Sequence, residues 1–267
     1  MSTALAKYGT TDLGALRAAQ MQLVEDSASS RAQFMKLVEG ANQVRILPPW
    51  DPKMRSPFYE LWLHYIRSSA DPQGKGKPVA CPLKMRKSKT CVACADVRRR
   101  FDTGSPADEQ VAKALRSTRR VYANVVNMLD PSKGVQVLDF GTMLYEKFLN
   151  RMLGAPSDTG VPDVAALGDI SHPELGYTMV IDRKGTKQFD TKYELRAARS
   201  PSPIADPAWL TQLHDLSTIV AYRDNDYIRA VLAGEDPVDG EAVFSIGPVG
   251  GAVPPPADRD FEDATFE

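Results

Sequence analysis

The alternation of apolar and polar residues predicts a sheet of at least six strands. The predicted strands cover residues 42–47, 58–66, 121–128, 134–140, 177–183 and 192–197. Pro48 and Pro49 separate the first two strands, which are expected to form a hairpin. The last two strands flank a turn at Lys184 and Gly185 and are expected to form a second hairpin.

Helical spacing of apolar residues occurs around and after these strands. Leu144, Phe148 and Met152 predict a helix over residues 142–153. Near the C-terminal end, Asp206 and Pro207 supply an N-cap and a first-turn proline for a helix over residues 209–216, and residues 227–231 predict a second helix. The fold class is therefore mainly β with α, in an α+β arrangement.

The composition along the chain predicts three parts. Residues 1–28 form an N-terminal arm with a short amphipathic helix that could contact other proteins. Residues 29–234 form the core domain. Residues 235–267 contain glycine and proline runs that cannot form a regular element, followed by an acidic end, and are expected to be a flexible acidic tail.

Charge is strongly polarised, although the formal net charge is only −1. Between Lys75 and Lys133 there are 14 Lys and Arg residues against five Asp and Glu residues. From Gly234 to Glu267 there are nine acidic residues against a single arginine. A basic middle segment favours a polyanionic partner, whereas the acidic end favours protein partners or the basic segment itself.

The three cysteines of the chain lie within 14 residues and predict a metal site. Cys91 and Cys94 have the C-x₂-C spacing that lets two thiolates bind one tetrahedral metal, and Cys81 could supply a third thiolate. His64 is the natural fourth ligand, with His172 and His214 as alternatives. The competing interpretation is that the cysteines are free, small buried apolar residues. Residues 67–105 lack periodicity, so a structural Zn²⁺ would replace their missing core in a zinc subdomain at about residues 64–105.

Basic and aromatic residues occur together in the same segment. Binding any single strand requires cations along the backbone and aromatic faces for unstacked bases. Alternation predicts that Tyr122 points away from the core, and Phe189 lies near a hairpin tip. The alternative is that the cations cover a solvated helix face and that the aromatics are core residues. The candidate DNA-binding residues are Lys84, Arg86, Lys87, Lys89, Arg98, Arg99, Arg119, Arg120, Tyr122, Phe189 and Lys192.

The order of these elements resembles the helix-destabilising single-stranded DNA-binding proteins of T4-like phages. The resemblance covers about 160 residues, and the two gaps between the cysteines look like those of the family. The matching elements are Val44-Arg45-Ile46-Leu47-Pro48, Pro57-Phe58 leading to His64, the three cysteines, 119–125, Phe140-Gly141 with the following helix, and the hairpin that ends at Pro203-Ile204.

This resemblance implies an OB-fold core with an inserted His-Cys₃ zinc subdomain whose ligands are His64, Cys81, Cys91 and Cys94. It also implies a cleft that holds single-stranded DNA, and coating of single strands in DNA replication, recombination and repair, with self-association along DNA through the N-terminal arm. The acidic tail would recruit replication and recombination proteins and compete with DNA. Its aromatic and acidic tip resembles that of bacterial single-strand binders, and comprises Asp260, Phe261, Glu262, Asp263 and Phe266.

Other function classes are less well supported by the sequence. A zinc-stabilised RNA-binding or transcription-regulating module would use the same residue types. An enzyme is disfavoured because the chain has no Walker loop, no Ser-His-Asp arrangement on recognisable turns and no carboxylate cluster outside the tail. No apolar run of about 20 residues predicts a membrane span, and no secretion signal precedes the core, so the expected location is the cytoplasm.

Overall fold

The chain divides into two compact units, residues 1–33 and residues 34–267. A computed structural model describes residues 34–67, 76–154, 165–185 and 190–235, together with Gly14 and Arg17 of the first unit. Phe189, nearly all of the predicted N-terminal arm, and the acidic tail beyond Glu235 lie outside the described residues.

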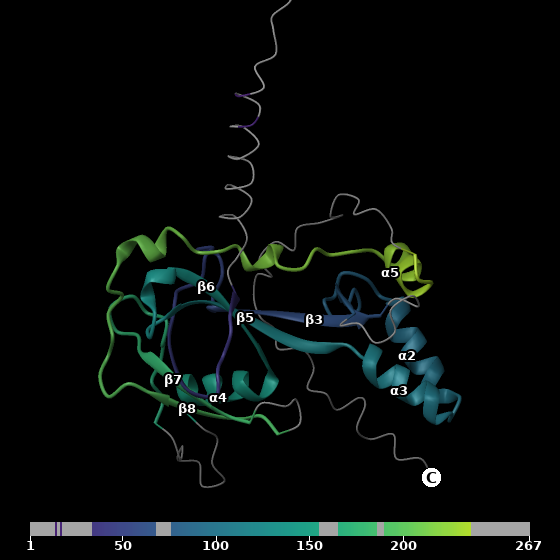
Figure 1. Cartoon of the computed structure of the whole chain (residues 1–267), viewed down its shortest axis with the longest axis horizontal. Helices are drawn as coiled ribbons and strands as arrows, with labels where there is room; N and C mark the ends of the chain where they lie inside the picture. The colour runs from purple at the N-terminus through teal and green to yellow at the C-terminus, as the bar shows by residue number, and fades with distance from the viewer. Residues whose placement is uncertain are drawn as a thin grey trace, which may run out of the picture. The chain divides into compact units, whose positions relative to one another are not determined.

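An eight-stranded mixed sheet forms the centre of this unit (Figure 1). The six predicted strands are all present, and a short strand at each of two further places completes the sheet. Its strands are β1 (Phe34–Met35), β2 (Gly40–Ile46), β3 (Phe58–Ile66), β4 (Lys77–Ala80), β5 (Thr118–Asn127), β6 (Val135–Gly141), β7 (Thr178–Lys184) and β8 (Lys192–Ala197). Together with its helices, the sheet confirms the α+β class.

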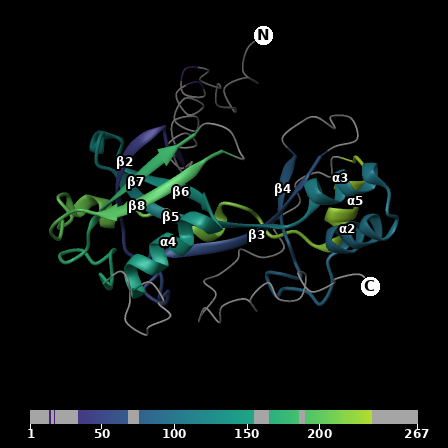
Figure 2. The same ribbon diagram turned by 90° about the horizontal axis from the view of Figure 1, so that it is seen from below.

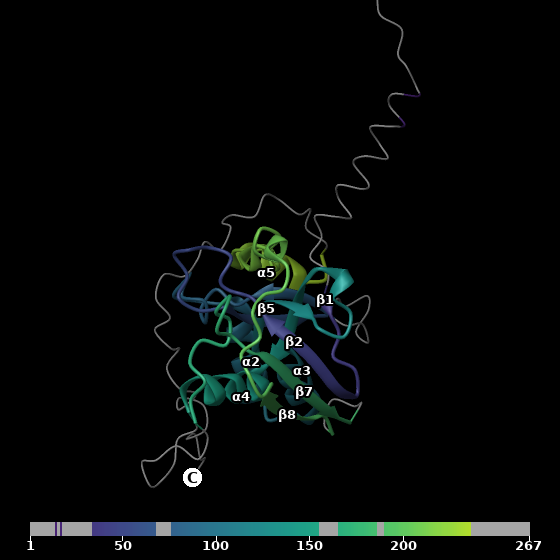
Figure 3. The same ribbon diagram turned by 90° about the vertical axis from the view of Figure 1, so that its left-hand side faces the viewer.

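Strand β5 is the longest strand of the sheet, and β2 and β3 both pair with it. Phe58 to Leu63 of β3 pair with the first half of β5, and Val44 to Ile46 of β2 pair with its second half. The predicted hairpin between β2 and β3 is therefore wrong: β2 pairs instead with β5 and β7. Because β5 is ten residues long, β2 and β3 can each pair with a different half of it and need not pair with each other. The predicted β7–β8 hairpin is confirmed (Figure 3).

The main hydrophobic core lies between one face of the sheet and helix α4 (Thr142–Leu153), whose bounds match the prediction. Val121, Ala123 and Val125 of β5 all point into this core. On the helix side, Phe148 packs against Phe58 and Phe140, with ring centroids 5.5 and 5.4 Å away. Burial of these large aromatic side chains packs α4 as a second layer against the sheet.

Arg45 is a charged residue inside this unit, with a side chain that is 1% exposed. Its side chain points into the interior, where it binds the loop that follows α4 and the loop that follows β8. Burial lowers the pKa of Arg45, against the effect of Asp169, which raises it. Its guanidinium donates hydrogen bonds of 2.5–2.9 Å to the backbone carbonyls of Ile46, Ile170, His172 and Ser202.

A second, smaller core lies at the far end of β3 from α4 and β7 (Figures 1 and 2). It contains helices α2 (Val92–Asp102), α3 (Pro106–Leu115) and α5 (Asn225–Leu232). Ile66 and Val79 of the sheet meet Cys81, Leu115 and Ile228 in it. We call residues 76–115 with α5 the metal-binding module, for the reason given below.

Residues 207–224 connect the sheet to α5. The predicted helix over residues 209–216 is wrong, because two 3₁₀ turns, Pro207–Leu210 and Leu216–Thr218, stand there instead. Trp209 packs in a small core beside β2, β5 and β6, and Asn124 exchanges two hydrogen bonds, 2.9 and 3.0 Å long, with the backbone of His214. The predicted second helix is present as α5. Among the described helices, none is both long enough and apolar enough to cross a bilayer.

Candidate metal centre and nucleic-acid interface

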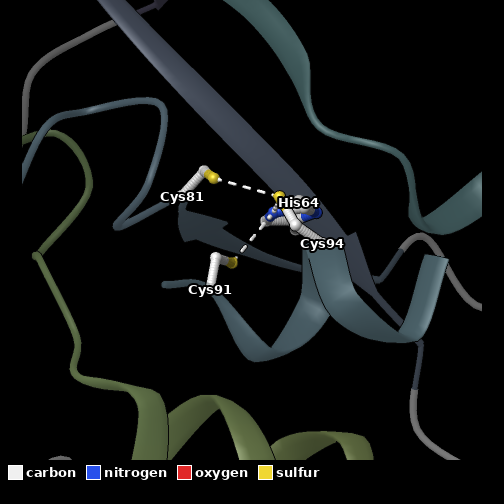
Figure 4. Close-up of side chains that lie close together, drawn as sticks. All are labelled: His64, Cys81, Cys91 and Cys94. Atoms are coloured by element: carbon white, nitrogen blue, oxygen red, sulfur yellow. Dashed lines mark hydrogen bonds between the residues drawn. The ribbon is translucent and has the colours of Figure 1, made fainter. Parts of the chain in front are cut away.

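His64, Cys81, Cys91 and Cys94 converge on one point, as Figure 4 shows. One ligand atom from each side chain lies within 4.8 Å of all the others. The Nε2 atom of His64 is 3.5 Å from the Sγ atoms of both Cys91 and Cys94, and the Sγ atoms of Cys81 and Cys94 are 3.5 Å apart. The set is close enough to bind a metal ion.

These separations fit a tetrahedral ion with nitrogen and sulfur ligands. Zn–S bonds of about 2.3 Å and Zn–N bonds of about 2.0–2.1 Å place tetrahedral ligand atoms roughly 3.5–3.8 Å apart. Three of the six ligand pairs have separations of 3.5 Å, which agree with this, and all six lie within 4.8 Å. Three thiolates and an imidazole are the soft donor set of a closed structural zinc site, which leaves no position for a substrate.

A hydrogen bond orients the imidazole of His64 for this role. Its Nδ1 atom is 2.7 Å from the carbonyl oxygen of Leu115, the last residue of α3. Because a carbonyl can only accept, Nδ1 carries the proton, and Nε2 keeps its lone pair toward the sulfurs. The backbone N–H of Lys84 also points at Cys81 Sγ, at 3.4 Å.

The side chains also influence each other's protonation. Burial opposes a charged His64, but without a metal the hydrogen bonds with Cys81 and Cys91 and with the Leu115 carbonyl raise the pKa of His64 to about 10. A metal ion would therefore displace a proton from Nε2 when it binds there. Hydrogen bonds from Cys81 and Cys94, aided by His64, lower the pKa of Cys91 below its ordinary range. Hydrogen bonds with Cys81 and Cys91 raise the pKa of Cys94 above its ordinary range. A thiolate is the form in which cysteine binds metals, so metal binding would also displace a proton from Cys94.

Each of the four side chains comes from a defined place on a strand or a helix. His64 comes from β3, and Cys81 follows the edge strand β4 directly. Cys91 is the N-cap of α2, which places Cys94 in its first turn. Asn225, at the start of α5, accepts a 3.0 Å hydrogen bond from the Val92 backbone and so fixes the same turn.

The two alternative histidines have other partners. His172 Nδ1 accepts hydrogen bonds of 3.1 Å from the backbone N–H groups of Glu174 and Leu175. The Nε2 atom of His214 lies 3.1 Å from the carbonyl oxygen of Val135. Among the described residues, the metal-capable group includes His64 and neither of these.

The candidate cations of the metal-binding module are mostly exposed. Arg86, Lys87 and Lys89 lie in the turn between Cys81 and α2, with their side chains in solvent. Arg98 and Arg99 lie on the exposed side of α2, where Arg99 forms an ion pair with Asp96. Lys84 is half-buried because its ammonium lies over the Trp62 ring, 5.0 Å from the centroid.

Arg119 and Arg120 point to opposite faces of the sheet, as neighbours in a strand must. Arg119 shares the α4 face, and its guanidinium forms an ion pair with Glu60 and lies 5.2 Å from the Tyr145 ring centroid. Arg120 forms an ion pair of 2.8 Å with Asp139 on the other face. One DNA strand that follows a single face therefore meets only one of the two arginines.

Tyr122 points away from the main core, as predicted, but its side chain is only 3% exposed. It pairs with Tyr59 and Asp139 on its two neighbouring strands. The segment around His214 lies along the same face, where it binds Asn124. The alternation thus gave the right face, and on that face Asn124 binds a segment 90 residues away in sequence. Tyr122 offers no exposed ring for stacking in this structure.

The remaining candidates lie at the β7–β8 hairpin. Lys192 begins β8 opposite Lys184, and its side chain is exposed. Phe189 lies outside the described residues, so its predicted stacking role stays a prediction.

The sequence reasoning did not identify Glu60 and Tyr145, which fix Arg119. Tyr145 donates a 2.7 Å hydrogen bond to one carboxylate oxygen of Glu60, and Arg119 binds the other. The signal was present in β3: Glu60, Trp62 and His64 alternate with apolar residues, so they share one face.

The fold and the site together define a β-sheet protein with an inserted His-Cys₃ module that presents a basic loop. Basic loops around metal-built modules are typical of nucleic-acid-binding proteins. The family described as "gp32 DNA binding protein like" matches residues 38–231, more than half of the chain. The chain therefore belongs to the gp32-like DNA-binding protein family, a family of binding proteins rather than enzymes. No curated protein matches the chain.

Proposed function

We propose that this protein binds single-stranded DNA without sequence preference and coats it during replication, recombination and repair. The observation that carries the proposal is the exposed cation group of Arg86, Lys87 and Lys89 on a turn bounded by two metal-ligating cysteines. Cations of this kind contact phosphates, which have the same chemistry at every base. Membership of a DNA-binding family supports the same conclusion.

The metal in this proposal is Zn²⁺, bound by His64, Cys81, Cys91 and Cys94. When bound, zinc would join these four side chains in a fixed geometry, which a small apolar core cannot do. The chain's own residues position the ligands: the Leu115 carbonyl orients the His64 imidazole, and α5 packs against the first turn of α2. The role of the centre is to fix the shape of the basic turn.

We further propose that the sheet is an OB-fold. The chain order β2, β5, β6, α4, β7, β8 is the strand, strand, strand, helix, strand, strand order of that fold, with β3 as an extension that carries the module. Pairing of β2 with β5 and β7, of β5 with β6, and of β7 with β8 gives four of its ladders. OB-folds bind single strands on an open face of the barrel.

The terminal segments complete the proposal. The acidic tail, with Asp260, Phe261, Glu262, Asp263 and Phe266 at its tip, recruits replication and recombination proteins and competes with DNA for the cations. The N-terminal arm supports self-association along DNA, and the location is the cytoplasm. Truncation at Gly247 should raise DNA affinity most at low salt. If the truncated and the full-length protein bound DNA with equal affinity at every salt concentration, competition by the tail would be excluded.

Removing the three cations of the basic turn is expected to flatten the salt dependence of DNA binding. Each phosphate contact on a single strand contributes roughly 0.7 to the slope of log K against log salt. The variant Arg86→Ala/Lys87→Ala/Lys89→Ala should therefore lower that slope by about 2, measured by anisotropy of a labelled dT oligomer. Lys133→Ala, which removes an exposed cation between β5 and β6, is the control and should change it by less than about 0.5.

Competition between DNA and RNA of equal sequence separates the proposal from an RNA-binding role. A sequence-tolerant DNA binder should prefer the DNA oligomer, or bind both through phosphates. A strong preference for the RNA oligomer would show that the site recognises 2′-hydroxyl groups and would favour an RNA-binding module.

A further inference from the structure

Trp62 lies at the junction of the sheet and the metal-binding module. It is on the α4 face of β3, between Glu60 and His64, and its partner in β5 is Arg119. Phe58 and His64 on the same face are buried, whereas Trp62 is only partly buried. The indole is therefore a large aromatic surface that the two cores leave partly uncovered.

A cation covers the ring of Trp62. The Nζ atom of Lys84, from the turn that follows Cys81, lies 5.0 Å from the centroid of the ring. On the other side along β5, Arg119 is held by Glu60. Trp62 thus has one cation over its ring and a second, Arg119, as its partner in the neighbouring strand, and single-strand sites combine aromatic rings with cations in this way.

The backbone of Trp62 is rigidly tied to the metal-binding module. Its carbonyl accepts a 2.7 Å hydrogen bond from Cys81 N, and its N–H donates to Met85 Sδ at 3.4 Å. Two residues further on, His64 is a metal ligand. The backbone position from which the ring extends is therefore fixed before a base binds, and a preformed site costs less ordering entropy.

We propose that Trp62 is a base-stacking residue of the single-strand site, with Lys84 as its cation gate. A base would replace the ammonium on the indole, because stacking a base on an aromatic ring is the stronger interaction. Lys84 then moves to the adjacent phosphate. This inference rests on the proposed function and adds a contact that needs no change in the position of buried Tyr122.

The other tryptophans provide matched controls. Trp209 is 7% exposed and lies in the small core with Leu47 and Val126. Trp50 packs edge-on against Tyr59, with ring centroids 5.5 Å apart, and Tyr59 is on the opposite face of β3 from Trp62. DNA bound at Trp62 should therefore leave the fluorescence of both controls nearly unchanged.

Fluorescence titration of the zinc-loaded full chain with a dT oligomer tests the assignment. The variant Trp62→Phe should lose most of the DNA-induced quenching, whereas Trp50→Phe should retain it. Trp62→Ala should weaken binding about ten-fold or more, because a whole stacking surface is lost. Lys84→Gln should keep the quenching and reduce the salt slope.

Photo-cross-linking of the unmodified protein gives a second measurement that does not depend on the folding of any variant. An oligomer with iododeoxyuridine should cross-link to the peptide that contains Trp62. If the protein binds the dT oligomer but Trp62→Phe quenches fully and cross-links map elsewhere, this inference fails alone. If the unmodified protein does not bind the dT oligomer, the proposed function fails as well.

Discussion

Replacing Cys91 with serine is expected to open the metal-binding module, including β4, while the rest of the sheet stays folded. The variant loses one of four ligands, and a structural zinc ion contributes on the order of 10 kcal/mol to folding of a small module. Amide exchange in residues 76–115 should therefore accelerate by more than about 100-fold, and proteases should cut there. Chelation of the unmodified protein should give the same pattern.

Protection elsewhere distinguishes this local effect from global unfolding. Val121 and Ala123 lie in the main core, which contains no metal ligand, and their amides should stay protected. His172→Ala is the matched control, because this histidine only accepts backbone hydrogen bonds in a loop. Equal protease sensitivity of residues 76–115 with and without chelator would contradict a structural metal.

Replacing Arg45 with methionine is expected to cause the largest loss of stability in the sheet. The carbonyls of Ile46 and Ser202 would lose this donor, whereas those of Ile170 and His172 keep hydrogen bonds from the backbone N–H groups of Tyr177 and Gly176. A buried acceptor without a partner costs about 1–3 kcal/mol, so a total loss of about 2–6 kcal/mol follows, even though methionine fills much of the volume. Urea denaturation measures it.

Two further variants define the cause of that loss. Arg45→Lys keeps the charge but cannot reach four carbonyls with a planar fork, so it should recover only part of the stability. Arg116→Met, at the exposed C-cap of α3, removes a surface arginine and should change stability by less than about 0.5 kcal/mol. If Arg45→Met lost as little free energy of unfolding as Arg116→Met, this result would contradict the proposed role of the guanidinium.

The sequence predicted elements whose signal is local. Residues 58–66 are rich in aromatic and apolar residues that favour a strand, and residues 142–153 have unbroken helical spacing, so both elements match their predicted bounds. The cysteine spacing predicted the metal-capable group for the same reason, since Cys91 and Cys94 are one helical turn apart. His64 could be chosen because β3 ends beside the cysteine segment.

The missed features depend on contacts between distant segments. Helix α2 was not predicted because Ala93 is its only buried residue, so an apolar stripe is absent. Its position depends on two cysteine ligands and on Asn225 of α5, 133 residues away in sequence. On the face where Tyr122 is buried, Asn124 likewise binds His214, 90 residues further along the chain, and no local pattern encodes that contact.

The alternation of side chains divides two of the predicted DNA-binding residues between the faces of the sheet. Arg119 and Arg120 are adjacent in the sequence, and each forms an ion pair on its own face of the sheet. The α4 face also carries Trp62 and, above it, Lys84. We therefore place the proposed DNA path on the α4 face.

The most direct test of the central claim is a titration of the full chain with poly(dT) and with duplex DNA of equal length, at two salt concentrations. We predict strong, salt-sensitive quenching of tryptophan fluorescence by poly(dT) and little response to duplex DNA, because only unpaired bases can stack. No response to poly(dT), or an equal response to duplex DNA, would contradict single-strand binding at this site.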